Sequence, residues 1–453
     1  MQSEMSQEVH CNTNKSSVAT FAIVLSLFMA AVDGTIVSTV LPEITNSLGQ
    51  PSLYPWVMSG FLLPVALIAP FVGAVGDRVG IKPTLTVSIM VFMIASVLAA
   101  NASTMQMLIL ARVLQGIGAG SIIVLCYALL AAVFPVNERA KMQGMLSGVW
   151  GISAILGPIL GGSLSSMFGW ESIFLINIPI GLIALAMLLK VKSLDIGKNQ
   201  SKLKIDFLAQ IAFVIISLAV MLLVSTNHIE WLNNYILAFM ALGAFILLTA
   251  RVLIDSNASP IPTVFFKRMS LIATVVLILV SSATLYSAVT IIPVTLSELG
   301  QTTMSLSVLI TMAALGWVFG AAICGSKLAK FGFRNLSFIG TVLLFMGTLG
   351  IVSAINTTFV PLIAACLALI GLGMGFVSTT TLVYVQNSAP KEQLGRWTST
   401  VQFLRNLGSA IGISLFTTIQ LSQDNGYQLS FYILAGVIFV GTLFSFVLPK
   451  SYQ

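Results

Sequence analysis

The chain contains few charged residues and almost no histidine. Of its 453 residues, 8% are Asp, Glu, Lys or Arg and two are His, whereas 57% are hydrophobic. A soluble protein of this length presents a far more charged surface, so the composition excludes a soluble fold. Both histidines, His10 and His228, lie outside the apolar runs, and the four cysteines stand singly. These residues therefore supply neither a metal-binding motif nor the His/Asp cluster that a membrane enzyme would need, and we expect no metal and no cofactor.

Long apolar runs recur along the whole chain, and its mean hydropathy is +1.02. Runs of about 18 or more apolar residues are typical of transmembrane helices, because a helix satisfies its own backbone hydrogen bonds in lipid. The first run begins near Val18 after a polar tail and has no small-residue cleavage site, so we expect no cleavable signal peptide. The pattern predicts an all-α membrane protein with fourteen spans, at residues 18–41, 55–75, 83–100, 105–133, 141–165, 170–190, 206–225, 232–252, 270–293, 304–325, 335–355, 358–383, 394–421 and 429–448.

The distribution of basic residues predicts how these spans are oriented. With the N-terminus placed in the cytoplasm, the inner segments, together with the inner ends of the spans, hold 19 of the 21 Lys and Arg residues, and the other two, Arg112 and Arg405, lie deeper within spans. Cytoplasmic loops of membrane proteins are enriched in Lys and Arg. The basic residues of the cytoplasmic loops therefore account for the net charge of +7, and a nucleic-acid-binding surface is not needed to explain it. We expect both termini to be cytoplasmic. The charged residues of the outer loops are all acidic: Glu43, Glu171, Glu230, Glu298 and Asp424.

The two halves of the chain repeat weakly. The stretch GAVGDRVGIK (73–82) follows the second span and GSKLAKFGFR (325–334) follows the tenth, with two glycines and a final basic residue at matching positions. GIGAG (116–120) likewise resembles GLGMG (371–375). Internal repeats are typical of secondary transporters. The predicted organisation is a cytoplasmic tail, a six-helix bundle, linkers with two inserted helices, a second six-helix bundle and a short tail, at residues 1–17, 18–190, 191–269, 270–448 and 449–453.

Several stretches resemble the major facilitator superfamily, and in particular its fourteen-helix drug:proton antiporter branch. GAVGDRVGIK resembles the signature loop between the second and third helices, and LILARVLQGIGAG (108–120) resembles the fourth-helix motif with an intramembrane arginine. GVWGISAILGPILGG (148–162) resembles the antiporter motif of the fifth helix, while VDGTIVSTVLP (32–42) and FLINIPIG (174–181) are typical of the branch. The resemblance covers essentially the whole chain and implies a major facilitator fold and drug export. Some members of the branch carry a further acidic residue in the second half, and spans 9 to 14 of this chain have none.

Asp33 is the acidic residue that the sequence places well inside a span. An ionisable group in a membrane indicates a functional site. Removal from water favours the neutral acid and a nearby cation favours the carboxylate, so a proton and a cationic substrate can exclude each other at this position.

Arg112 is the predicted partner of Asp33. Asp33 lies ~12 Å and Arg112 ~10 Å from the outer ends of their spans, at 1.5 Å per residue, and the resemblance places these helices side by side. Arg112 would then adjust how tightly Asp33 holds a proton, and Gln115, one turn further, would join the network. The alternative is a static pair that only fixes helix packing.

The fifth span is rich in residues that permit close packing. Small residues let helices approach each other and proline kinks a helix. The resemblance implies that this helix limits leak during exchange, whereas simple packing explains the same spacing. The residues concerned are Gly148, Gly157, Pro158, Gly161 and Gly162.

The cytoplasmic loop after the second span is a candidate gate. Its glycines permit a tight turn, and its aspartate can bind the N-terminus of a neighbouring helix. The resemblance implies a latch on the outward-open state, and the alternative is a solvated loop. The candidate residues are Asp77, Arg78, Gly80, Lys82 and Arg139.

A cavity for amphipathic substrates needs apolar and aromatic walls. The candidates are Phe61, Trp150, Trp317, Phe376 and Gln402. Arg405, inside the thirteenth span without an evident carboxylate partner, is a candidate for contact with an anion or substrate, with bonding to carbonyl groups as the alternative. Glu298 is a candidate for attracting cations at the outer mouth, or an ordinary interfacial charge.

The resemblance and the residues together predict a proton-driven multidrug efflux antiporter in a bacterial cell membrane. We expect a monomer that exports amphipathic, cationic or zwitterionic drugs by alternating access, with the lipid bilayer and small-molecule drugs as its partners. The alternatives are a dedicated exporter of one compound, such as tetracycline or an endogenous metabolite, and coupling to sodium instead of protons. A uniporter or a receptor is a further class, and the antiporter-like fifth helix disfavours uptake by symport.

Overall fold

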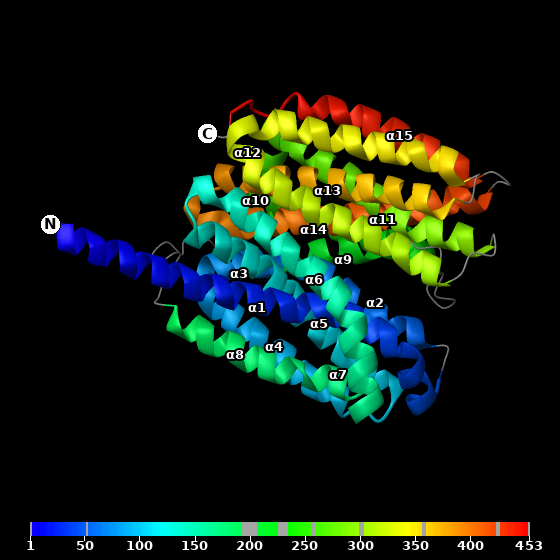
Figure 1. Cartoon of the computed structure of the whole chain (residues 1–453), viewed down its shortest axis with the longest axis horizontal. Helices are drawn as coiled ribbons and strands as arrows, with labels where there is room; N and C mark the ends of the chain where they lie inside the picture. Colours follow the sequence, from blue (N-terminus) through cyan, green and yellow to red (C-terminus); the bar gives the residue numbers. More distant parts are fainter. Residues whose placement is uncertain are drawn as a thin grey trace. The chain divides into compact units, whose positions relative to one another are not determined.

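The computed structural model of the chain describes residues 2–50, 53–191, 206–224, 234–255, 259–298, 303–355, 359–422 and 426–451. In these residues the regular secondary structure is helical, and a helix occupies each of the fourteen segments predicted from the apolar runs (Figure 1). Helices are what lipid requires of a chain this apolar, because each helix pairs its own backbone groups. The prediction of an all-α membrane protein is confirmed.

The first half of the chain contains two broken helices. In chain order its helices are α1 (Gln2–Leu48), α2 (Tyr54–Leu67), α3 (Ala69–Val79), α4 (Ile81–Ala100), α5 (Met105–Val133), α6 (Val136–Phe168), α7 (Ser172–Leu175) and α8 (Asn177–Lys190). α2 and α3 meet at 47°, with Pro64 inside α2 and Pro70 at the start of α3. Proline lacks an N–H and its ring displaces the carbonyl four residues earlier, which bends the chain. Ile176 alone separates α7 from α8.

The described residues of the second half form the following helices. They are α9 (Phe207–Val224), α10 (Asn234–Ile254), the short η3 (Thr263–Phe266), α11 (Met269–Glu298), α12 (Thr303–Ile355), α13 (Val360–Ser388), the short η4 (Lys391–Gln393), α14 (Leu394–Ser422) and α15 (Gly426–Ser445). α12 consists of two helices in sequence, because Gly332 interrupts it with φ 73° and ψ 172°.

Ten helices of the described ranges are long and apolar enough to cross a membrane, and the bent pair α2–α3 brings the number to eleven. α12 counts once among the ten although Gly332 divides it. The apolar part of α9, Phe207–Ala219, is shorter than a span. The chain is therefore a multi-pass membrane protein, and the number of fourteen spans stays a prediction.

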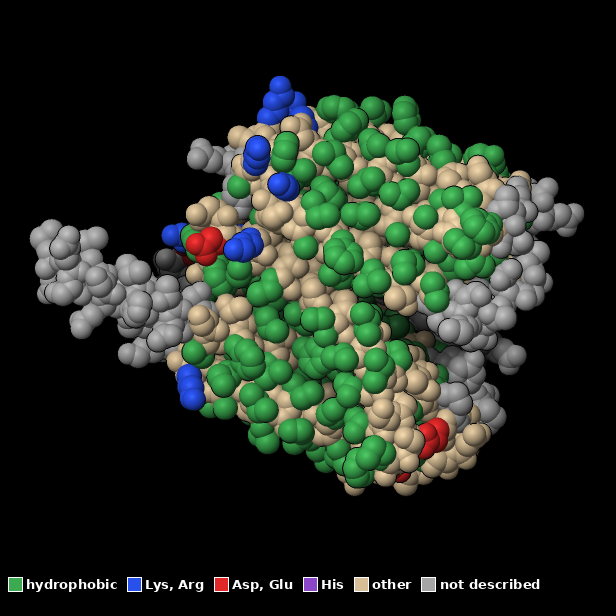
Figure 2. Space-filling view, in the orientation of Figure 1, with side chains coloured by type: hydrophobic (Ala, Val, Ile, Leu, Met, Phe, Trp, Pro, Cys, Tyr) green, Lys and Arg blue, Asp and Glu red, His purple; other side chains and the backbone are tan. Residues whose placement is uncertain are grey.

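The surface agrees with this assignment. Hydrophobic side chains cover most of the described face in Figure 2. On α10, Phe239 is 75% exposed and Leu253 is 82% exposed. Exposed apolar areas of this extent favour aggregation in water but match the hydrocarbon of a bilayer.

The chain folds as two compact units. The first comprises residues 1–136, 152–205 and 389–399, and the second comprises residues 137–151, 206–388 and 400–453. α6 and α14 therefore contribute one part of their length to each unit.

The two glycine-rich motifs pack in the same way in the two units. A side chain at Gly116 would collide with the backbone of α2, and one at Gly118 with the backbone of α4. A side chain at Gly371 would collide with the first helix of α12, and one at Gly373 with the second. Each motif thus brings a helix into backbone contact with two neighbours, which small residues permit. The equivalent packing supports the predicted internal repeat.

The two repeated loops also share their geometry. Gly80 has φ 111° and Gly332 has φ 73°, a region that glycine adopts without steric cost. The Lys82 Nζ donates to two carbonyl groups at the C-terminal end of α8. The Arg334 Nε donates to the carbonyl of Leu448, just after α15, at 3.0 Å. Each basic side chain therefore complements the partial negative charge where the last helix of its half ends.

An ion pair joins the two inserted helices. Asp206, directly before α9, accepts hydrogen bonds from the Ala209 N–H at 3.0 Å and from the Arg251 Nε, near the end of α10, at 2.7 Å. Burial raises the pKa of Asp206, but these hydrogen bonds and the positive charge of Arg251 outweigh burial and leave the pKa below its ordinary value. The pair ties the start of α9 to the end of α10, so the two helices form an antiparallel hairpin.

We predict that Gly332→Ala destabilises the protein and that Gly436→Ala does not. At Gly332 a Cβ would collide with the carbonyl of Lys450. Alanine would also have to adopt a positive φ there, and this backbone strain costs about 1–3 kcal/mol. At the exposed, helical Gly436 a Cβ meets no atom within 4 Å. Thermal unfolding of both variants in detergent measures the difference, and equal unfolding midpoints would contradict the proposed strain.

Candidate functional site

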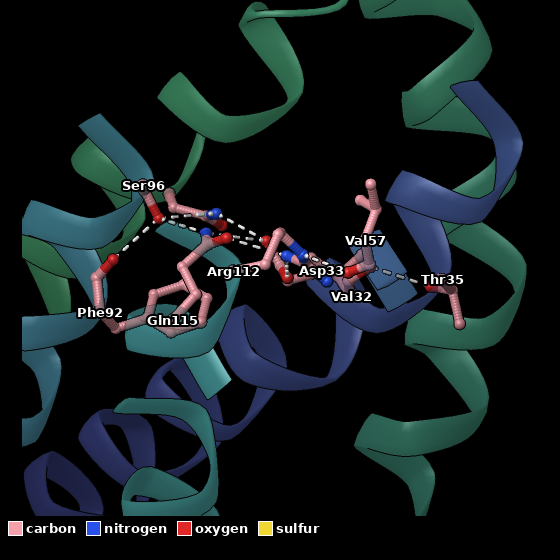
Figure 3. A network of polar contacts seen from close by, with 9 residues as sticks. Val32, Asp33, Thr35, Val57, Phe92, Ser96, Arg112 and Gln115 are labelled. Atoms are coloured by element: carbon pink, nitrogen blue, oxygen red, sulfur yellow. Dashed lines mark hydrogen bonds and ion pairs between the residues drawn. The ribbon is translucent and has the colours of Figure 1, made fainter. Parts of the chain in front are cut away.

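Asp33 lies in the middle of α1, within a segment that is otherwise apolar. Its side chain is fully buried in the first unit. A carboxylate without water needs several donors to remain charged. The structure supplies them from α5 and α8 (Figure 3).

Arg112 forms an ion pair with Asp33, as the matching depths in the sequence predict. The Arg112 Nη1 lies 2.5 Å from the Asp33 Oδ2, and both side chains are 0% exposed. The same nitrogen donates to the Gln115 Oε1 at 2.8 Å, and the Gln115 Nε2 donates to the Asp33 Oδ1 at 3.3 Å. The predicted trio of Asp33, Arg112 and Gln115 is therefore one network (Figure 3).

Two further members of this network, Asn177 and Ser96, were not predicted. The Asn177 Nδ2 donates to the Asp33 Oδ1 at 3.1 Å and to the Ser96 Oγ at 3.2 Å. The Gln115 Nε2 also donates to the Ser96 Oγ, at 2.8 Å. Asn177 begins α8 directly after the break at Ile176. The available signal was an amide in the middle of the apolar stretch FLINIPIG.

Aromatic rings cover the guanidinium of Arg112. Its Cζ lies 4.1 Å from the centroid of Phe61 and 5.9 Å from that of Phe174. The negative face of an aromatic ring attracts such a cation. The Arg112 Nε donates to the Val57 carbonyl at 3.3 Å. Phe61, a predicted cavity residue, therefore contacts the ion pair in this structure.

Two polar atoms of the network are buried without a hydrogen-bond partner in the described structure. They are the Arg112 Nη2 and the Asn177 Oδ1. One is a donor and the other is an acceptor, so the network retains the capacity to bind a water molecule or a polar group of a ligand.

Span 5 packs closely at some of its predicted glycines. A Cβ at Gly157 would collide with the hydroxyl of Thr35 in α1, and one at Gly161 would lie 3.0 Å from the Ile36 carbonyl. At Gly148 and Gly162, by contrast, a Cβ would meet no atom within 4 Å. Pro158 lies inside α6 next to Gly157. Of these glycines, Gly157 and Gly161 are thus the ones that lie against α1.

Asp77 binds the N-terminus of a helix, as the loop motif predicts. Its Oδ1 accepts from the Gly395 N–H at 2.6 Å and its Oδ2 from the Arg396 N–H at 2.8 Å, at the start of α14. A carboxylate at this end of a helix is stabilised by the helix dipole. Gly73, one turn earlier, is essential to this contact because a Cβ there would collide with Gly395 and Ser399.

The other predicted gate residues have different positions. Arg78 is exposed. Gly80 forms the turn before α4, and the side chain of Lys82 caps the C-terminal end of α8. Arg139 belongs to the second unit, where its Nη1 donates to the Gln386 carbonyl and to the Asn387 Oδ1. Of the candidate gate residues, Asp77, Lys82 and Arg139 therefore make separate contacts at the ends of different helices.

The remaining predicted cavity residues fall into two pairs and one single residue. Trp150 and Trp317 stack with their ring centroids 6.5 Å apart. The Arg405 Nη1 donates to the Gln402 Oε1 at 3.3 Å. Phe376 is buried in the core of the second unit. The side chain of Glu298 lies outside the described residues.

Known proteins of similar sequence and structure agree with this architecture. Residues 23–413 match the family described as Major Facilitator Superfamily. The chain is 27% identical over 416 residues to "Multidrug transporter protein MdtP" of Bacillus subtilis, and the alignment covers 91% of this chain and 76% of that protein. It is 28% identical over 421 residues to "Multidrug efflux pump SdrM" of Staphylococcus aureus, and the alignment covers 90% of this chain and 91% of the pump. The crystal structure of the human organic anion transporter MFSD10 superposes with a TM-score of 0.71 at 17% identity, covering 95% of this chain and 99% of that chain.

The family match spans most of the chain, so the chain belongs to the Major Facilitator Superfamily. It is a membrane transporter and not an enzyme.

We predict that Asn177→Ala weakens the buried network. Asp33 and Ser96 each lose one donor, while Gln115 continues to donate to both, so the free energy of unfolding should fall by about 1–2 kcal/mol. Thermal unfolding in detergent measures the loss. Asn335→Ala is the matched control, because Asn335 is exposed on α12. An Asn177→Ala variant as stable as the control would contradict the role of Asn177.

We also predict that Gly157→Ala is far more damaging than Gly148→Ala in the same helix. The added methyl group at Gly157 collides with Thr35, and overpacking of this kind costs about 1–3 kcal/mol. At Gly148 the methyl group enters open space. If both variants unfold at the same temperature, the proposed contact between α1 and α6 is wrong.

Proposed function

We propose that the chain is a proton-coupled multidrug efflux antiporter of a bacterial cell membrane. It takes amphipathic, cationic or zwitterionic drugs from the cytoplasm and releases them outside by alternating access. The observation that carries this proposal is the fully buried pair of Asp33 and Arg112.

Asp33 is suited to exchange because its surroundings act on its charged and neutral forms in opposite directions. Burial favours the neutral acid, whereas Arg112, Gln115 and Asn177 stabilise the carboxylate. A proton that binds Asp33 weakens the ion pair and releases Arg112 from its counter-ion. A cationic group of a drug competes for the same carboxylate, so the proton and the drug exclude each other, which is the requirement for antiport.

The glycine contacts and the helix caps support alternating access. α6 touches α1 through Gly157 and Gly161, directly beside the turn after Asp33. A change in the charge of Asp33 therefore acts on the helix that resembles the antiporter motif. Asp77 at the N-terminus of α14 forms a contact that can break and re-form without loss of secondary structure.

The relatives supply the substrate class of the proposal. Two of them bear the names multidrug transporter and multidrug efflux pump, and both align over about nine-tenths of this chain. We propose further that the protein acts as a monomer, that the proton is the coupling ion and that the chain belongs to the fourteen-helix branch.

Transport in proteoliposomes tests this function. We expect wild-type protein to accumulate the cationic dye ethidium when a pH gradient is imposed, and Asp33→Asn to lose this accumulation because its amide cannot titrate. Asp255→Asn is the control, since Asp255 is an exposed acid between helices. Unchanged gradient-driven accumulation in Asp33→Asn would refute the assignment, and accumulation driven by a sodium gradient without a pH gradient would refute proton coupling.

A further inference from the structure

Arg405 is a buried cation in the second unit that the exchange mechanism does not use. It lies 11 residues after the start of α14, ~16 Å along the helix at 1.5 Å per residue. The residue is 7% exposed. A charge at this depth is costly and indicates a functional site.

No carboxylate within the helices of this half can neutralise Arg405. In α11, α12, α13, α14 and α15 the one acidic residue is Glu298, at the last position of α11. Arg112, the buried arginine of the first unit, has Asp33 as its counter-ion. Among the described residues, the guanidinium of Arg405 makes one hydrogen bond, to the Gln402 Oε1. Arginine has five N–H donors, so most of its capacity is unused.

Gln402 leaves a second donor next to Arg405. Its Nε2 is buried and has no hydrogen-bond partner in the described structure. Gln402 and Arg405 are three residues apart and therefore lie on one face of α14. A buried amide N–H without a partner and a guanidinium with a single hydrogen bond in the described structure form a pair of donors that an anion would satisfy.

The neighbouring helix adds a polar group on the same side. Gly408 and Gly412 of α14 approach the backbone of α11 at Leu279 and Ala283. Arg405 precedes Gly408 by one turn, so its side of α14 faces α11. Tyr286, one turn after Ala283, is half-buried and within electrostatic range of Arg405.

We propose that Arg405 and Gln402 bind the carboxylate of the exported molecule. The guanidinium offers the planar, bidentate geometry that carboxylates prefer, and the Gln402 amide donates beside it. This inference rests on the proposed export function and narrows its cargo to amphipathic molecules that carry an anionic group, such as zwitterions. Exchange of one proton for a zwitterion moves one positive charge inward, so a negative interior drives this export.

Two dyes that differ in one group test the inference by equilibrium binding. Rhodamine 110 carries a free carboxylate, and rhodamine 123 is its methyl ester. Fluorescence polarisation measures the affinity of purified protein in nanodiscs for each dye. We expect the wild type to prefer rhodamine 110, and Arg405→Gln to weaken rhodamine 110 by ~10-fold or more while rhodamine 123 changes less than about twofold. Lys327→Gln is the control, because it removes an exposed positive charge from a different helix, α12.

Several outcomes decide the matter. A wild type that binds rhodamine 123 as tightly as rhodamine 110 overturns the proposal without any variant. An equal loss of both dyes in Arg405→Gln also overturns it, because a purely structural role would weaken both. Arg405→Lys keeps the charge and should retain part of the preference for rhodamine 110. The measurement needs no gradient, so failure of proton antiport in proteoliposomes and failure of carboxylate binding are distinguishable.

Discussion

The rest of the structure is arranged around a salt bridge removed from water. Asp33 and Arg112 lie 2.5 Å apart with no exposed surface. Such a pair gives little net stability, because desolvation offsets most of the attraction, but loss of one partner leaves an uncompensated charge. The break between α7 and α8 lies directly before Asn177, which donates to Asp33, and α2 contributes the Phe61 ring and the Val57 carbonyl to Arg112. The apolar fold therefore maintains one polar centre that is sensitive to charge.

The two halves use the same mechanical parts and differ in their chemistry. The glycine-rich motifs of α5 and α13 and the basic caps of Lys82 and Arg334 occupy equivalent positions. The first half adds an acid beside its buried arginine, whereas the second half leaves Arg405 without one. The first half also has Asp77 at a helix N-terminus, and the repeat has Ala329 there. The repeat thus provides a common scaffold on which each half carries its own charges.

The sequence was sufficient to predict features that depend on the length of apolar runs or on how deep a residue lies in its span. Long apolar runs identified the helices, and equal depths in two spans identified Asp33 and Arg112 as partners. It was not sufficient for Asn177, because this residue reaches Asp33 only through the helix break at Ile176. The sequence also does not specify which way a ring faces, so the contact of the Phe61 ring with the Arg112 guanidinium could not be predicted. Glycine spacing alone could not separate Gly157, which touches Thr35, from Gly148, which touches nothing.

A single titrating acid also sets a thermodynamic ceiling. If every cycle passes through Asp33 alone, one hydrogen ion enters for each molecule that leaves. A monovalent cation is then exchanged without net charge, and its concentration ratio cannot exceed the ratio of hydrogen ions across the membrane, about tenfold per pH unit. Cells at neutral external pH would gain little protection against such a compound. Molecules of zero net charge escape this limit, because the electrical potential contributes to their expulsion.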